Sequence, residues 1–266
     1  MKTLIRSFLL VLFFVGSASV SVSTAQTQDA EELVLVDLAV MNEPYDQAER
    51  DVYSAKTEEI AKQYGIKKAQ SYRIIKYLDG QGPQDALELN LWTYDDPDDM
   101  QKFSSDPEYK ARIPLRNVLH DMDALTLYTA KPKLQGAAPN PSQFVLVDFA
   151  VMNEDFGQAE RDTYVRETER IAAKYGAKRF ASYHIVQHLG GAGPEDVLVL
   201  DLWAMDDPSA LQKLSSDPEY KANVPERNKI HNMEALTLYL AKAKAASARE
   251  DAGMSGMSDV GGMGGM

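Results

Sequence analysis

The chain contains no cysteine among its 266 residues. This excludes disulfides, thiolate nucleophiles and thiolate metal sites. It also excludes the lipid anchor of exported lipoproteins, because that anchor is built on a cysteine. Without covalent cross-links, the protein must take its stability from a packed core, and two domains of about 100 residues each are large enough to bury one.

Positive charge is also scarce. The 28 lysines and arginines stand against 40 aspartates and glutamates, which gives a formal net charge of −12. Such an acidic surface repels phosphate backbones and anionic lipid headgroups. We therefore expect no nucleic-acid partner and no membrane association after processing. Cationic ligands, or solubility alone, are compatible with this charge.

No apolar run near the N-terminus is long enough to span a bilayer, which takes about 20 residues. The run Phe8–Val15 follows Lys2 and Arg6 and precedes the small residues Ser23-Thr24-Ala25. This order is typical of a secretory signal peptide. We predict a signal peptide over residues 1–25 and an exported protein, periplasmic or secreted. A retained membrane anchor is the alternative.

The motifs of common catalytic sites are missing as well. The sequence has no nucleophile elbow, no HExxH and no calcium-binding loop. The turn DGQGPQD at residues 79–85 lacks the lysine and the strand–helix context of a phosphate-binding loop. We therefore predict no metal site and no required cofactor.

The chain does contain an internal repeat. Residues 33–130 align without gaps with residues 144–241, and about 58 of the 98 paired positions are identical. We expect two copies of one domain, joined by a spacer at residues 131–143. The Gly/Met-rich tail at residues 245–266 has little to bury and is expected to be disordered. Copper(I) binding by its methionines is the alternative.

Each copy carries the signals of a strand, a helix, two strands, a second helical region and a last strand. In the first copy these are Leu33–Met41, a helix capped by Asn42 and ended at Gly65, Ser71–Leu78, Leu87–Tyr94, a broken helix with starts at Asp96-Pro97 and Asp106-Pro107, and Ala124–Ala130. A βαββαβ order with short connections predicts a ferredoxin-like α+β fold, with both helices on one sheet face.

The other face of such a sheet has no cover within its own copy. We predict that the two tandem ferredoxin-like βαββαβ repeats pack sheet-to-sheet as an intramolecular α+β barrel, related by a pseudo-twofold axis. Two independent domains on a flexible spacer are the alternative. Further pairing of this pseudo-dimer into a homo-oligomer is compatible with the sequence.

The repeated segments SSDPEYKARIPLRN and SSDPEYKANVPERN, each followed by a short apolar strand, support a family resemblance. They resemble the closing segment of a family of small uncharacterised bacterial proteins in the dimeric α+β barrel superfamily. The resemblance covers nearly all of both repeats and implies the fold. That superfamily includes cofactor-independent monooxygenases, isomerases, cyclases, haem enzymes and proteins without known activity. No catalytic motif of these branches can be placed on this sequence residue by residue.

Strand alternation divides the side chains of each sheet between two faces. Val34, Val36 and Leu38 are expected to lie under the helices. The face between the two copies is then expected to be polar, with these residues: Asp37, Arg73, Tyr77, Asn90, Trp92 and Tyr128 in the first copy, and Asp148, His184, His188, Asp201, Trp203 and Tyr239 in the second. These side chains predict either a wet ligand pocket or a structural hydrogen-bond network.

The second copy carries the more reactive set. At the positions of Arg73, Tyr77 and Asn90 it has His184, His188 and Asp201. A histidine beside carboxylates is an acid–base pair near neutral pH, so Asp148, His184 and Asp201 are the candidate catalytic residues. A metal shared by His184 and His188 is not expected, because four residues of strand separate them by about 13 Å. The other polar residues of this face are candidate ligand-binding residues.

The functions compatible with this pattern belong to different classes. The first is a small-molecule-binding protein with cofactor-independent acid–base activity, isomerase-like or monooxygenase-like. The second is a non-catalytic binding or scaffold protein. A haem-binding protein is the third, which the superfamily resemblance alone suggests. His120 and His231, just before the last strands, are expected to contact helix C-terminal carbonyls rather than frame a pocket mouth.

Overall fold

The computed structural model describes residues 32–244. The first half contains β1 (Leu33–Val40), α1 (Gln47–Lys62), β2 (Lys67–Asp79), β3 (Ala86–Tyr94), α2 (Pro97–Ser105), α3 (Pro107–Leu119) and β4 (Thr126–Gln135). The second half contains β5 (Phe144–Val151), α4 (Gln158–Ala172), a short 3-10 turn (Ala173–Tyr175), β6 (Lys178–Gly190), β7 (Val197–Met205), α5 (Ser209–Ser216), α6 (Pro218–Ile230) and β8 (Thr237–Ala243). The predicted signal peptide and the predicted tail lie outside the described residues.

The helix starts follow local side-chain chemistry. Asp96 and Asp106 cap α2 and α3 as the sequence predicts, each followed by proline in the first turn. The start predicted for α1 is wrong, because Asn42 does not cap it. Asp46 does, accepting from the backbone N–H of Ala48 while Glu49 returns a bond to the cap. Asn42 instead donates to the carbonyl oxygens of Val118 and His120.

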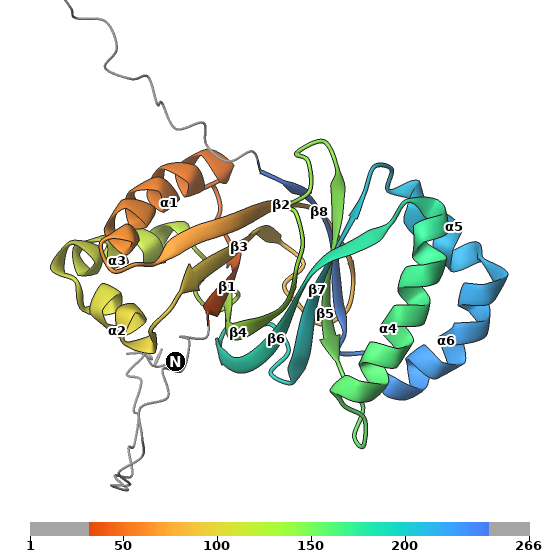
Figure 1. Cartoon of the computed structure of the whole chain (residues 1–266). Coiled ribbons are helices and arrows are strands. Elements are labelled where there is room, and N and C mark those ends of the chain that lie inside the picture. The colour runs from red at the N-terminus through yellow and green to blue at the C-terminus, as the bar shows by residue number, and fades with distance from the viewer. Residues whose placement is uncertain (1–31, 245–266) are drawn as a thin grey trace, which may run out of the picture.

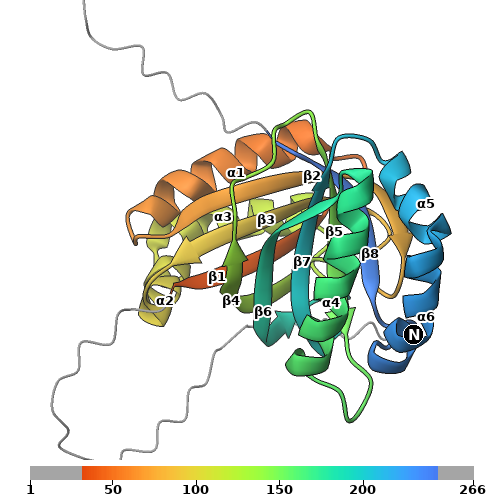
Figure 2. The same ribbon diagram turned by 45° about the vertical axis from the view of Figure 1, so that its right-hand side comes forward.

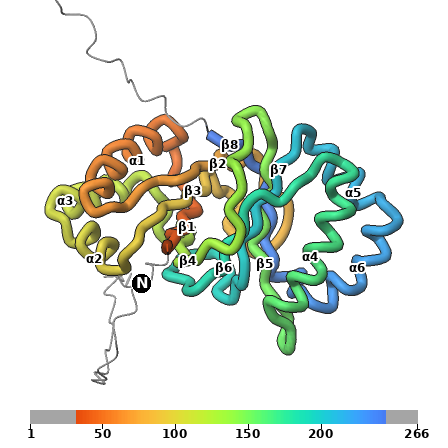
Figure 3. The backbone as a smooth tube through the Cα atoms, viewed as in Figure 1, coloured from red at the N-terminus to blue at the C-terminus, as the bar shows by residue number. Residues whose placement is uncertain are grey.

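The strands form one closed antiparallel barrel in the order β1-β3-β2-β8-β5-β7-β6-β4. The two halves face each other across the barrel, but they are also joined at both sheet edges, by β2 with β8 and by β4 with β6. The backbone trace in Figure 3 shows β8, near the end of the described chain, beside β2. Closure leaves no free edge among the described strands, which removes sites for unwanted strand pairing.

The helices form two separate layers outside the barrel. The helices α1, α2 and α3 cover the first half and α4, α5 and α6 cover the second, on opposite sides of the molecule (Figure 1). Figure 2 shows the same arrangement after rotation, with α4 lying over the strands of the second half. No helix within residues 32–244 is both long and apolar enough to cross a membrane.

The barrel interior is apolar, which corrects the predicted orientation of the strands. Val34, Val36 and Leu38 point into the barrel and share one core cluster with Val145 and Val147 of the other half. The alternate residues, including Asp37 and Asp148, lie under the helices instead. The physical reason is that helices can offer hydrogen-bond partners to buried polar groups, whereas the shared barrel core offers few.

The spacer between the halves is shorter than the sequence predicts. The expected spacer covers residues 131–143, but β4 continues to Gln135 and pairs with β6 as far as Ala181. The added strand length forms one of the two seams that close the barrel. Residues 136–143 connect it to β5.

One end of the barrel is closed by exchanged loops. The loop at residues 80–85 of the first half packs on β8, where Tyr239 donates to the Pro83 carbonyl and Thr237 accepts from the Gly82 N–H. The second half repeats this on β4, with Tyr128 donating to Pro194 and Thr126 accepting from Gly193. Each half therefore holds the loop of the other.

Candidate functional site

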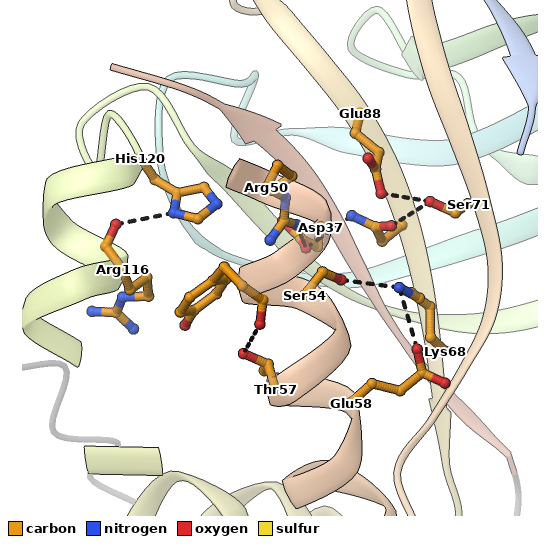
Figure 4. Close-up of polar contacts among 12 residues, drawn as sticks. Asp37, Arg50, Ser54, Thr57, Glu58, Lys68, Ser71, Glu88, Arg116 and His120 are labelled. Atoms are coloured by element: carbon orange, nitrogen blue, oxygen red, sulfur yellow. Dashed lines mark hydrogen bonds and ion pairs between the residues drawn. The ribbon is translucent and has the colours of Figure 1, made fainter. Parts of the chain in front are cut away.

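A buried polar cluster lies between the strands and helices of the first half (Figure 4). Arg50 of α1 is 4% exposed and donates to Asp37 of β1 at 2.8 Å. The amide of Asn90 on β3 also donates to Asp37, at 3.2 Å. The Arg50 guanidinium and the Asn90 amide thus donate to the same oxygen of Asp37, and the buried Glu88 carboxylate joins the cluster through the Ser71 hydroxyl.

The second half repeats the arginine–aspartate geometry with different neighbours, because Asp201 replaces Asn90 and Val199 replaces the buried Glu88. Arg161 of α4 is 2% exposed and lies 2.8 Å from Asp201 and 3.3 Å from Asp148. Asp201, which replaces Asn90, is fully buried and also lies 3.3 Å from Arg179 of β6. Two arginines therefore face two carboxylates under α4, and this balance allows the charges to stay buried.

The two aspartates sit directly opposite each other on β5 and β7. Burial raises the pKa of Asp148 to about 6, and the nearby Asp201 carboxylate adds to that rise while Arg161 opposes it. A carboxyl group with such a pKa exchanges its proton near neutral pH. That property suits a general acid or base.

His231 fixes the position of Arg161. Its Nδ1 lies 3.1 Å from the Arg227 carbonyl at the end of α6, and its Nε2 lies 3.4 Å from Arg161 Nη1. Burial, and next the positive charge of Arg161, lower the pKa of His231 to about 4. A neutral imidazole donating from Nδ1 and accepting at Nε2 satisfies both contacts. His120 makes the equivalent bond to the Arg116 carbonyl, so both histidines contact helix ends as expected.

A cavity of about 120 Å³ adjoins this cluster, between the sheet of the second half and α4, α5 and α6. Its polar wall includes Asp148, Arg161, Tyr164, Thr168, Tyr220, Arg227 and His231. Its apolar wall includes Leu146, Val165, Trp203, Met205, Leu211 and Leu214. Three buried atoms of lining residues have no hydrogen-bond partner: Asp148 Oδ1, Arg161 Nε and Thr168 Oγ1. The cavity thus joins unsatisfied polar residues to apolar walls.

The first half carries larger side chains at the matching positions. Tyr94 stands where the second half has Met205, and Phe103 stands where it has Leu214. Both aromatic residues are buried, and the Phe103 ring lies 4.2 Å from that of Tyr109. Asp37 Oδ1 and Arg50 Nε are unpartnered there too. The halves therefore differ both in buried polar groups, since Glu88 and Asn90 become Val199 and Asp201, and in the space beside the cluster.

The structure brings together two of the three candidate catalytic residues. Asp148 and Asp201 share the Arg161 cluster, whereas His184 is half-buried and forms no hydrogen bond with either of them. Trp203 lines the cavity. His184 lies two residues beyond Ser182, the residue of β6 that pairs with Asp201, so the strand carries it along the sheet and away from the cavity.

Apart from Trp203, which lines the cavity, the predicted ligand-binding residues fall into three groups. Asp37, Asn90 and Trp92 lie under the helices of the first half. A second group lies near the loop-covered end of the barrel: Tyr77, Tyr128, His188 and Tyr239. The ring centroids of Tyr128 and His188 are 5.0 Å apart, and those of Tyr77 and Tyr239 are 5.8 Å apart. Arg73 is exposed. One pocket holding all of them is therefore excluded.

The helical half of the site is absent from the residues predicted from the sequence. Arg161, Tyr164 and Thr168 lie on α4 at spacings of three and four residues, which places them on one helix face. Their signal was present in the sequence, because arginine inside an otherwise buried helical stripe needs a carboxylate partner. Only the packing of α4 on β5 and β7 shows which carboxylates those are.

A metal ion or haem does not fit this arrangement. Within residues 32–244 no three histidines, aspartates or glutamates are grouped to hold a metal ion. The Nε2 of His231 already faces Arg161, and the cavity of about 120 Å³ is far smaller than the several hundred Å³ that even drug-sized ligands occupy. We therefore assign no chemical step to haem.

Comparison with known proteins supports the fold. No protein-family model matches the sequence, and no curated protein matches it. An anthrone oxidase-like protein of solved structure is 13% identical with a TM-score of 0.52, covering 82% of this chain and 93% of that chain. A chlorite dismutase from Candidatus Nitrospira defluvii, in complex with imidazole, is 15% identical with a TM-score of 0.49, covering 81% and 92%. The likeness to the anthrone oxidase-like protein shows that the chain shares its mixed α+β fold.

Proposed function

We propose that the second half binds a small organic molecule in the cavity beneath α4, and that Asp148 accepts a proton from it without a cofactor. The observation that carries this proposal is the cavity itself, where apolar walls meet buried polar residues that lack partners. A ligand with an apolar body and one polar group would supply both kinds of contact. We also propose that the protein acts after export, because residues 1–25 have the order of a signal peptide.

The size of the cavity limits the ligand. An apolar cavity of about 150 Å³ is known to hold one benzene molecule. The cavity here measures about 120 Å³, so a single six-membered ring is the upper limit for the part of the ligand that enters it without movement of the helices. Phenols and cyclic enols of that size belong to the class we propose.

The arrangement suits removal of a proton. An ionised Asp148 would take the proton from an O–H or an acidic C–H bond, and the electron pair of that bond would stay on the ligand as an oxyanion or enolate. The guanidinium of Arg161 would stabilise this charge, while neutral His231 holds Arg161 in place. Return of the proton to another carbon is isomerase-like. Reaction of the carbanion with dioxygen would be monooxygenase-like: the CH₂ carbon of the ligand would become a carbonyl with one oxygen atom, and the other oxygen atom would leave as water with the two hydrogens, the ligand supplying the electrons. The fold neighbour named anthrone oxidase-like is compatible with it.

The raised pKa of Asp148 predicts a pH dependence of stability. Because its pKa rises from 3.8 to about 6 on folding, this group favours the folded state fully below about pH 4 and loses that contribution as the pH rises to 6. We expect Asp148→Asn to remove about 2–3 kcal/mol of this change. Urea unfolding from pH 4 to pH 8 measures it, with Asp37→Asn as the matched variant in the first half. Equal slopes in wild type and Asp148→Asn would contradict the role of Asp148.

Filling the cavity should abolish ligand binding. In Leu214→Phe the second half acquires the side chain that the first half has at Phe103, and the ring would occupy the space beside Trp203. We expect the affinity for phenol, measured by saturation-transfer NMR or calorimetry, to fall at least about tenfold, since the ring volume is lost. Leu211→Met conserves volume, matches Met100 of the first half, and should retain binding. Equal binding by wild type and Leu214→Phe would place phenol elsewhere.

Binding without turnover is the second candidate. It is favoured by the tight hydrogen bonding of Asp201, which faces both Arg161 and Arg179 and so serves structure more than proton transfer. The variant Asp148→Asn distinguishes the two candidate functions. If it still binds phenol with the wild-type affinity but no longer exchanges protons of the bound ring, the result supports proton transfer by Asp148. Unchanged exchange supports binding alone.

A further inference from the structure

The barrel has a second cavity at its other end. It measures about 210 Å³ and lies where β1 begins and β3 and β4 end, opposite the end covered by the exchanged loops. Its lining includes Glu32, Val34, Gln70, Leu91, Thr93 and Tyr183. No residue of this lining belongs to the cavity beneath α4, so the two spaces are separate.

Two differences between the halves shape this cavity. On β2 the first half has Ala69 and Gln70, where β6 of the second half has Phe180 and Ala181. Phe180 is buried in the barrel core, with its ring 6.4 Å from that of Tyr72. Ala69 is the equivalent residue in the first half, across the pseudo-twofold axis. Its small side chain leaves open the volume that a phenylalanine would fill. Gln70 brings an amide into a barrel whose other inward residues are mainly aliphatic and aromatic.

The amide of Gln70 is not satisfied by the protein. Gln70 pairs with Leu91 on the inward face of the sheet, and its Oε1 is buried without a hydrogen-bond partner. Tyr72, the next inward residue of β2, is 1% exposed, and its hydroxyl is also unpartnered. Leaving a buried acceptor unpaired costs free energy unless a ligand or water supplies the missing donor.

The lining favours a donor that carries positive charge. It contains one carboxylate, Glu32, and no lysine, arginine or histidine. Glu32 accepts a hydrogen bond from Gln135 Nε2 at 2.9 Å. Burial raises the pKa of the Tyr183 hydroxyl to about 12, and the negative charge of Glu32 adds to that rise. Tyr183 therefore stays a neutral hydroxyl. The lining thus combines the acceptor oxygens of Glu32, Gln70 and Thr93 with the apolar side chains of Val34 and Leu91.

We propose that this open end of the barrel binds a small primary ammonium ion. The ammonium group has three donors and would match Glu32 and the free oxygen of Gln70. A short alkyl chain would lie on Val34 and Leu91, and the Tyr183 ring offers a further favourable contact for a cation. Anions are disfavoured both by Glu32 and by the net charge of −12.

The test uses n-butylammonium and its neutral counterpart 1-butanol on the full chain, with binding followed by calorimetry and ligand-observed NMR. We expect the ammonium to bind at least about tenfold more tightly than the alcohol, because a charge-assisted hydrogen bond is the stronger one. Glu32→Gln should remove this preference. Ala69→Phe should abolish binding of both probes by filling the cavity as Phe180 does on the other side.

Controls keep the outcomes distinct. Glu226→Gln removes an exposed carboxylate of α6 and should leave binding unchanged. Leu214→Phe should also have no effect, so this proposal can fail or succeed independently of the site beneath α4. Equal binding of the two probes, or no loss in Glu32→Gln, would overturn the charge preference. Binding of neither probe to the wild-type protein, or unchanged binding to a folded Ala69→Phe protein, would overturn the site.

Discussion

Replacing Arg161 with alanine is expected to lower the free energy of unfolding by about 3–5 kcal/mol. Arg161 is 2% exposed and faces Asp201, which is fully buried, as well as Asp148. Its removal would leave two carboxylates close together in the protein interior, with Arg179 as the remaining positive charge near Asp201. Uncompensated buried charge is among the most destabilising changes a single substitution can make.

The loss should depend on pH in a defined direction. Arg161 opposes the rise in the pKa of Asp148, so that pKa should climb further in Arg161→Ala. Protonation then relieves the repulsion, and the destabilisation should be smaller at pH 4 than at pH 8. Urea unfolding at both values measures this. Arg170→Ala removes a half-exposed arginine from surface pairs and should cost less than about 1 kcal/mol. Similar losses for the two variants would contradict a buried network.

Replacing Gly80 with alanine should destabilise the protein by about 3 kcal/mol or more, and Gly191→Ala should behave in the same way. Both glycines have a positive φ, of 112° and 104°. A Cβ atom at Gly80 would lie far inside van der Waals contact of the Leu236 carbonyl, and one at Gly191 would meet that of Leu125. Because both obstacles are backbone atoms of the other half, a side-chain rotation cannot relieve the clash.

Gly176→Ala provides the matched control. Gly176 also has a positive φ, of 75°, but no atom lies within 4 Å of a Cβ built there. Its substitution should therefore cost only the conformational strain, about 1 kcal/mol. Thermal and urea unfolding of the three variants separate the two effects. If Gly80→Ala and Gly191→Ala cost no more than Gly176→Ala, the exchanged loops do not hold the halves together.

These variants matter because the loops join the halves at the closed end of the barrel. Tyr239 and Tyr128 each donate from one half to a loop carbonyl of the other, at 3.0 Å and 2.9 Å. The seams β2–β8 and β4–β6 add backbone hydrogen bonds along the barrel wall. Loss of a loop should therefore weaken the whole barrel rather than one half of it.

Local features of the sequence predict much of the fold. Aspartate before proline marks the starts of α2, α3 and α6, since a carboxylate cap and a proline in the first turn both favour a helix there. The order of strands and helices follows from the same local signals. The predicted start of α1 is wrong because Asn42 is also a good capping residue, and its side chain is used by the end of α3 instead.

The candidate site is less predictable. Alternation along β5 and β7 indicates that Asp148 and Asp201 share a face, and the structure pairs them directly. It does not show that this face lies beneath α4, where Arg161 provides the charge that both need. The prediction that His184 joins these two aspartates is wrong. Alternation shows which face of a strand a residue occupies, but not how far along the strand the cavity lies.

The sequence alone determined the absence of covalent cross-links, the internal repeat, the order of the elements and the sets of residues that share a strand face. Three features depend on how the two halves and their helices pack: which sheet face turns inward, which strand edges join, and which half keeps a cavity beneath its helices. The reason is physical: alternation is a property of one strand, whereas burial depends on the surface that covers it. In the closed barrel the most apolar faces of the two halves pack against each other. The aspartates lie on the opposite faces, where they form ion pairs with the arginines of α1 and α4.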